Sequence, residues 1–180
     1  MSIDKVQAVI NSQTYNLSFN AESQMWEAEI TAPSKSSYNI NDGHYYPITI
    51  KAQNNAGTES SVNDLDPDVG EDLRLKVIEK TKPVICINSP TDDQRKTNNK
   101  PQIIWNVTDD DSGVNPDSVS ITINNGQKIT SGISNQKITG GYKFTYTPEI
   151  ELPDGTNTVK CDASDYDKNE AVQRSVTCIL

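Results

Sequence analysis

The sequence has very little of the chemistry that enzymes use. Its 180 residues include one histidine, His44, so a catalytic triad or a multi-histidine metal site has at most one candidate base. The sequence contains no Gly-x-Ser-x-Gly, Cys-x-x-Cys or His-Glu-x-x-His motif and no glycine-rich phosphate-binding loop. We therefore expect a protein that is not an enzyme, with His44 lying at the edge of a loop.

Cysteine is also scarce. Three residues, Cys86, Cys161 and Cys178, are an odd and sparse set that does not make a disulfide framework. Cys161 and Cys178 fall on inward positions of neighbouring predicted strands, where cysteine serves as a small buried hydrophobe. A disulfide between these two cysteines remains an alternative, and it would need a diagonal geometry.

Long apolar runs are missing, and acidic residues outnumber basic ones. No apolar run approaches the ~18 residues of a membrane span, so we expect no membrane insertion. Residues 1–5 show no signal segment, so we expect either a protein that is not secreted by that route or an excised fragment. The formal net charge of −9 repels phosphate backbones and anionic lipids, which excludes nucleic acid as an expected partner.

The sequence is rich in short alternating runs. No stretch of about 12 residues has apolar residues at helical spacing, whereas apolar/polar alternation bounded by turn residues recurs about every ten residues. This pattern is typical of all-β sandwiches. A hydrophobic content of 33% suffices for such a fold, because each strand buries only one face.

One alternating stretch occurs twice, over residues 46–57 and 157–169. Each copy passes through an inward alanine, Ala52 or Ala163, into a loop of Asn, Asp and Gly. The repeat predicts two similar domains in tandem. We place the first domain at residues 1–79, a linker at 80–83 and the second domain at 84–180.

The alternation also predicts the strands within each domain. In the first domain we expect strands near residues 6–10, 15–19, 26–30, 46–54, 58–62 and 72–77. In the second we expect strands near residues 84–87, 103–107, 119–123, 144–146, 157–165 and 176–180, with a weak edge strand inside 127–141. Trp26 and Trp105 are in phase with the inward positions and are expected to anchor the cores. Asn124-Asn125-Gly126 predicts a hairpin turn.

Residues 82–180 resemble a bacterial immunoglobulin-like domain. The resemblance lies in Lys82-Pro83-Val84-Ile85, Thr108-Asp109-Asp110-Asp111-Ser112-Gly113 and Leu152-Pro153-Asp154-Gly155, with the strands between them. The first domain resembles the later strands of the same fold, with 26–30 as the fifth strand, 46–54 as the sixth and 72–77 as the seventh. The resemblance implies two tandem Ig-like β-sandwiches, the first abbreviated to about five strands and the second with seven.

The first domain is also similar to Ig-like modules attached to phage tails and tail-like particles of Gram-positive bacteria. That similarity lies in Tyr15-Asn16-Leu17, Trp26-Glu27-Ala28 and Asn55-Ala56-Gly57. It implies a structural protein of a virion or tail-like particle, whose partners are neighbouring subunits or the host envelope. The alternative is a bacterial cell-surface adhesin, or a carbohydrate-binding Ig-like module that contacts cell-surface glycan.

The first domain departs from the family pattern at its start. Residues 6–10 align with the third strand, at 119–123, so the two strands before it are missing. Either the sheet is reduced or trimmed, or a neighbouring chain supplies the missing edge by strand addition.

Calcium is the one cofactor for which the sequence offers ligands. In an Ig-like sandwich the loop after the second strand and the loop after the sixth lie at the same end, and the linker arrives there too. Hard oxygen ligands that converge in this way suit calcium. The alternatives are that the same side chains satisfy turn amides, or that Lys80, Lys82 and Lys168 neutralise them. The candidate ligands are Asp109, Asp110, Asp111, Asp165, Asp167 and Asn169.

Loop tyrosines are the second candidate for recognition. Tyr38, Tyr45 and Tyr166 fall in or beside predicted loops and could form a surface on which a glycan stacks. Isolated loop tyrosines are also common without any ligand.

Overall fold

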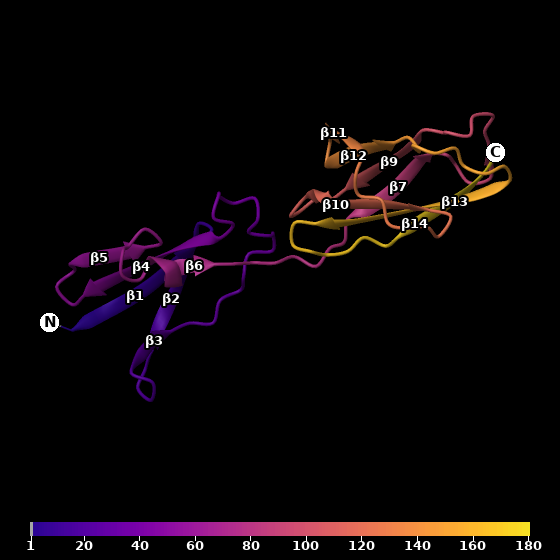
Figure 1. Cartoon of the computed structure of the whole chain (residues 1–180). Coiled ribbons are helices and arrows are strands. Elements are labelled where there is room, and N and C mark those ends of the chain that lie inside the picture. Colours follow the sequence, from indigo (N-terminus) through magenta and orange to yellow (C-terminus); the bar gives the residue numbers. More distant parts are fainter. Residues whose placement is uncertain (1) are drawn as a thin grey trace. The chain divides into compact units, whose positions relative to one another are not determined.

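The computed structural model describes residues 2–180, which divide into two compact units between Glu79 and Lys80 (Figure 1). Strands dominate both units, which confirms the all-β prediction. Within the described residues, no helix is long and apolar enough to cross a membrane.

The second unit is a sandwich of two four-stranded sheets. One sheet has the order β10-β13-β14-β8 and the other the order β11-β12-β9-β7. The two-residue strand β8 pairs in parallel with β14, in a segment between the strands predicted near 84–87 and 103–107 where no strand was expected. The strands are β7 (Val84–Ser89), β8 (Gln94–Arg95), β9 (Ile103–Thr108), β10 (Val114–Ile123), β11 (Ser134–Ile138), β12 (Gly141–Tyr146), β13 (Thr156–Asp165) and β14 (Arg174–Ile179).

The core of the second unit is built from alternate residues of both sheets. Trp105 of β9 is completely buried and stacks on Phe144 of β12, with ring centroids 5.6 Å apart. This position confirms Trp105 as a core anchor. The other buried members are Ile85, Ile103, Val107, Val114, Val119, Ile121, Tyr146, Val159, Cys161 and Ala163.

The predicted hairpin turn after β10 is present. Asn124 and Asn125 have φ angles of 50° and 56°, and the Gly126 amide donates to the Ile123 carbonyl at 2.9 Å. Positive φ at both central residues is the signature of a type I′ turn. The weak edge strand is β11, which pairs only with β12 among the described strands.

The strand register rules out a disulfide between Cys161 and Cys178. Cys161 lies opposite Arg174, whereas Cys178 lies opposite Asn157, four residues back along β13. Four residues of a strand span about 13 Å, well beyond the Cα separation of roughly 4.4–6.8 Å that a disulfide needs. All three cysteines are free, so Cys161 and Cys178 act as buried hydrophobes and Cys86 is exposed.

The first unit has one sheet with the order β3-β2-β1-β4-β5, and β6 also pairs with β4. The strands predicted near residues 6–10 and 15–19 are present as β1 and β2, which pair with each other as an antiparallel hairpin. A short 3-10 helix, η1 (Gly70–Leu73), precedes β6. The strands are β1 (Ile3–Ile10), β2 (Gln13–Asn20), β3 (Met25–Glu27), β4 (Tyr46–Asn54), β5 (Glu59–Asn63) and β6 (Arg74–Leu75).

Two strands of the first unit are shorter than predicted. The expected strand at 26–30 ends at Glu27. The expected strand at 72–77 is reduced to Arg74–Leu75, because β5 already pairs with β4 from Thr49 to Gln53 and leaves only Tyr46 and Pro47 for β6. Each backbone group makes its ladder bond once, so one edge of β4 cannot serve two strands along its whole length.

The inward face of the repeated strand is buried in the second unit and only partly buried in the first. In β13, Val159, Cys161 and Ala163 are at most 6% exposed. In β4, Tyr46 is buried, but Ile48, Ile50 and Ala52 are only half-buried. A second sheet covers the inward face of β13, whereas the strands of the first unit form one sheet (Figure 1).

Candidate functional site

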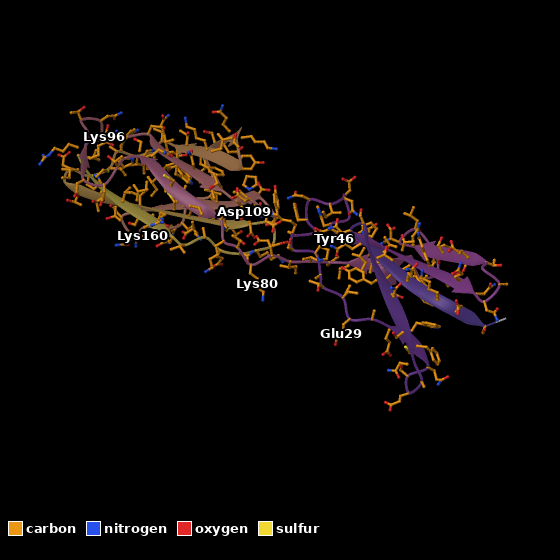
Figure 2. All side chains as sticks on the ribbon, turned by 180° about the vertical axis from the view of Figure 1, so that it is seen from behind. Glu29, Tyr46, Lys80, Lys96, Asp109 and Lys160 are labelled. Carbon is orange, nitrogen blue, oxygen red and sulfur yellow. The ribbon has the colours of Figure 1, made fainter. Side chains whose placement is uncertain are left out.

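Two acidic residues meet where two strands of the second unit end. Asp109 directly follows β9, and Asp165 is the last residue of β13. The register pairs Asp165 with Val114, the first residue of β10, so the loop from Asp109 to Val114 lies beside the end of β13. Figure 2 shows Asp109 at the same end of this unit as Lys80, where the chain enters it.

The carboxylates of Asp109 and Asp165 lie close together. One carboxylate oxygen of Asp109 lies within 4.8 Å of one of Asp165. Both residues are buried, with exposed fractions of 9% and 0% respectively.

The two oxygens of Asp109 have different surroundings. Oδ1 accepts hydrogen bonds from the backbone amides of Asp111 (3.1 Å) and Gly113 (2.7 Å). These bonds shape the turn, in which Gly113 has a φ of 91° that suits glycine. Oδ2 is buried and has no hydrogen-bond partner. Turn-capping therefore explains one oxygen of Asp109 and leaves the other without a role.

Asn169 holds the carboxylate of Asp165 in place. Oδ1 of Asp165 accepts from the backbone amide of Asn169, and Oδ2 accepts from its side-chain Nδ2, both at 2.8 Å. Each carboxylate oxygen has two lone pairs, so both oxygens of Asp165 can still accept a further contact.

The six predicted calcium ligands divide into two groups. Asp109 and Asp165 come together, and Asn169 orients Asp165. Asp110, Asp111 and Asp167 do not join this pair. Asp111 contributes its backbone amide to Asp109 instead.

The three tyrosines proposed for glycan stacking do not form one surface within a unit. Tyr38 and Tyr45 belong to the first unit and Tyr166 to the second. The ring of Tyr38 stacks on His44 with centroids 4.0 Å apart, and Arg74 lies 5.1 Å from the ring centroid of Tyr45. The Tyr38 ring and the Tyr45 ring therefore each already contact another side chain. Glycan binding by the three tyrosines stays a prediction.

The hydroxyl of Tyr45 is held as well. It donates to Oδ2 of Asp64 at 2.9 Å, and this bond is the main reason that the pKa of Tyr45 is raised.

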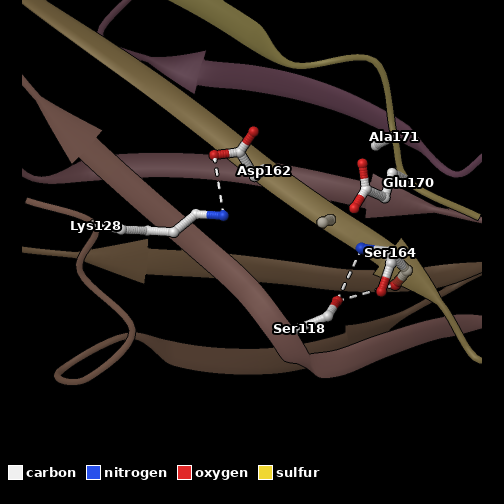
Figure 3. A pocket seen from close by; sticks show the side chains of 7 residues that line it. Ser118, Lys128, Asp162, Ser164, Glu170 and Ala171 are labelled. Carbon is white, nitrogen blue, oxygen red and sulfur yellow. Dashed lines mark hydrogen bonds and ion pairs between the residues drawn. The ribbon is translucent and has the colours of Figure 1, made fainter. Parts of the chain in front are cut away.

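A hollow of about 150 Å³ lies over the bulge between β10 and β13 (Figure 3). Four of the polar residues that line it are paired with one another. The Ser164 amide donates to Oγ of Ser118 at 2.8 Å, and Nζ of Lys128 lies 3.7 Å from Oδ2 of Asp162. Small-molecule sites usually measure roughly 300–1,000 Å³, so this hollow is too small for an ordinary ligand pocket.

Solved structures that resemble the chain include CopC from Methylosinus trichosporium OB3b, with 19% identity over 54% of this chain and 91% of that one (TM-score 0.41). The fibronectin(III)-like modules of Clostridium thermocellum CbhA share 14% identity over 99% and 78% (TM-score 0.41). The tandem Ig domains of titin share 11% over 98% and 80% (TM-score 0.32).

These low identities and TM-scores carry no inference about function. No curated protein matches the chain. A family model described as a bacterial Ig domain matches residues 83–161, which make up most of the second unit.

Proposed function

We propose that the chain is a non-catalytic structural module of a phage tail or tail-like particle, in which the first unit binds a neighbouring subunit. The observation that carries this proposal is the single sheet of the first unit, whose apolar face is only partly covered. An Ig domain next to such a sheet is the arrangement expected of a protein that links the subunits of an assembly or decorates its surface.

The partly covered face runs across four strands. Val6 of β1 lies opposite Leu17 of β2 on one side and Ala52 of β4 on the other, so these side chains share one face of the sheet. Val6 is buried at the centre, while Leu17 and Ala52 on either side are only half-buried. The coverage therefore decreases from the centre of the sheet outward.

The face continues to the outer strand β3. Phe19 lies opposite Trp26, with ring centroids 5.7 Å apart, and Phe19 is 51% exposed. Burying apolar area gains about 25 cal/mol per Å², so a partner that covered these rings would gain affinity. Among the described strands, β3 pairs only with β2, which leaves its outer edge available for strand addition.

Co-sedimentation tests the proposal. The tagged chain is expressed in cells that produce the particle, and the particles are purified by centrifugation. We expect the chain to co-sediment with tube, sheath or baseplate subunits. Phe19→Lys should release it, because a charge replaces the exposed apolar ring, and Val172→Lys should not.

Val172 is the matched control because it is 65% exposed on the second unit, outside the sheet that carries the proposal. A wild-type chain that never sediments with particles would contradict the proposal. Binding of the chain to a glycan array instead would support a surface adhesin.

A further inference from the structure

We propose that a hollow in the second unit binds a peptide segment of a partner protein, in which a large apolar residue lies between two basic residues. The hollow measures about 360 Å³, within the range of roughly 300–1,000 Å³ that is usual for binding pockets. All of its lining residues belong to the second unit, so the inference is separate from the role proposed for the first unit.

Most of the wall of the hollow is apolar. Tyr146 is 8% exposed, whereas Ile150 is 81% exposed. Ile123, Ile129 and Leu152 are half-buried and keep part of their apolar surface in contact with solvent. The apolar lining residues are Ile123, Ile129, Tyr146, Pro148, Ile150 and Leu152. Because removing apolar surface from water is favourable, an apolar side chain that entered the hollow would be stabilised.

Two carboxylates, those of Glu149 and Glu151, line the same hollow. Both residues are exposed, and within residues 2–180 neither side chain makes a hydrogen bond or an ion pair. The ammonium group of Lys100 donates to the backbone carbonyl of Glu149 at 2.8 Å instead, and Lys100 does not line the hollow. Two carboxylates beside an apolar wall complement two cationic groups that flank an apolar one. A peptide with a basic residue on each side of an aromatic residue has this chemistry.

Hydrogen bonds hold the walls of the hollow in place. Residues 148–152 are fastened at the Glu149 carbonyl and at the Leu152 amide, which donates to the carbonyl of Asn99 at 2.8 Å. The lining residue Asn124 is fixed by the hydrogen bonds of its side chain to the start of β13. Walls that are already ordered reduce the entropy cost of binding.

Nuclear magnetic resonance titration of the full chain tests the proposal, with the blocked tripeptide acetyl-Lys-Phe-Lys-amide as the probe. We expect saturable shifts of the amide signals of Ile123, Ile129 and Leu152, with a dissociation constant below about 1 mM. Acetyl-Glu-Phe-Glu-amide has the same ring and the opposite charges, and it should bind about tenfold more weakly. Acetyl-Lys-Ala-Lys-amide lacks the large apolar group and should also bind about tenfold more weakly.

The double variant Glu149→Gln/Glu151→Gln tests the charges. Because both residues are exposed, the variant should fold normally and bind the lysine peptide about fivefold more weakly. Asp117→Asn/Glu170→Gln is the matched control. It removes the same charge from two exposed residues outside the hollow and should leave the affinity unchanged.

Ile150→Ala tests the apolar wall and should weaken binding about threefold. Its control is Val172→Ala, at another exposed apolar position of the second unit outside the hollow, which should have no effect.

Three outcomes would overturn the proposal. They are the absence of saturable shifts at about 5 mM lysine peptide, equal affinity for the lysine and glutamate peptides, and full binding by the Glu149→Gln/Glu151→Gln variant. Phenethylamine has the ring and only one cationic group. If it bound as tightly as the lysine peptide, the hollow would be a site for a small amine and the peptide would be wrong.

Discussion

Nδ2 of Asn124 donates a hydrogen bond to Oδ1 of Asn157, 2.6 Å away, and ties the turn after β10 to the start of β13. The Asn157 side chain is completely buried and donates to the carbonyls of Pro153 (2.8 Å) and Gly155 (3.1 Å). In return, Oδ1 of Asn124 accepts from the Thr158 amide at 2.8 Å. Two asparagines thus satisfy the polar groups of one corner of the second unit.

Asn157→Asp should destabilise the second unit by about 3 kcal/mol, since it places a buried carboxylate against two carbonyls and removes their donor. Chemical denaturation at neutral pH measures the loss. Asn125→Asp, at the exposed neighbouring position of the turn, should cost less than about 1 kcal/mol. Equal effects of the two changes would contradict the role given to Asn157.

Phe144→Ala should cost the second unit about 3–5 kcal/mol, because Phe144 is 1% exposed and stacks on Trp105. Phe19→Ala removes the same atoms from a ring that is 51% exposed in the first unit, and should cost less than half as much. Calorimetry that resolves the two units measures both values. A larger loss from Phe19→Ala would show that the face of the first unit is buried in the isolated chain.

Gly141→Ala should separate β12 from β9, since a Cβ at residue 141 would overlap the backbone carbonyl of Val107. The backbone cannot move aside as a flexible side chain does. We therefore expect the free energy of unfolding of the second unit to fall by about 2–4 kcal/mol and the amides of β12 to exchange faster. Ser134→Ala on the exposed strand β11 is the control and should change the stability by less than about 0.5 kcal/mol. A stable Gly141→Ala variant with unchanged exchange would refute the close packing.

The cysteines should differ in reactivity. Cys86 is exposed, so a thiol reagent should label it in the native protein, whereas Cys161 and Cys178 should react only after unfolding. Mass spectrometry of native and denatured samples counts the labelled sites. Rapid native labelling of all three would mean that the sandwich opens readily.

Alkaline pH should weaken the second unit through Cys161. Burial raises the pKa of this thiol from 9.0 to about 12, so the unfolded chain loses its thiol proton at a lower pH than the folded chain does. The stability is therefore unaffected below pH 9 and falls between pH 9 and pH 12, by about 2 kcal/mol at pH 10.5.

Cys161→Ala is the comparison that isolates this effect, because other groups also titrate in the same range. The difference in stability between the wild type and Cys161→Ala should shift with pH over that window. A difference that is independent of pH would argue against a buried neutral thiol.

Most of the second unit could be predicted from the sequence because its signals are local. Ile103, Trp105 and Val107 alternate with polar neighbours, and alternation places them together on the buried face of one strand. Asn124-Asn125-Gly126 specifies its turn through backbone preferences alone. Strand β8 has no such signal, since Gln94 and Arg95 are held by pairing with β14 and not by burial.

The candidate site could be predicted only in part. The loops that carry Asp109 and Asp165 follow strands of a recognisable sandwich, so their meeting at one end follows from the fold class. The sequence could not show which oxygen of Asp109 accepts hydrogen bonds. In the structure the turn amides donate to Oδ1, and Oδ2 has no hydrogen-bond partner. It also could not separate the clustered Asp109 from its neighbours Asp110 and Asp111, which have the same chemistry.

The amino-acid sequence alone determined the all-β class, the two-part division and the inward face of each strand, because alternation and turn residues act over a few positions. Only the tertiary structure decided what covers those faces. Val159 and Ile50 occupy similar strands, yet Val159 is completely buried by an opposite sheet and Ile50 is half-buried on a lone one. Tertiary contact also brought Asp109 to Asp165, since proximity between residues distant in the sequence depends on how the strands of the second unit pack.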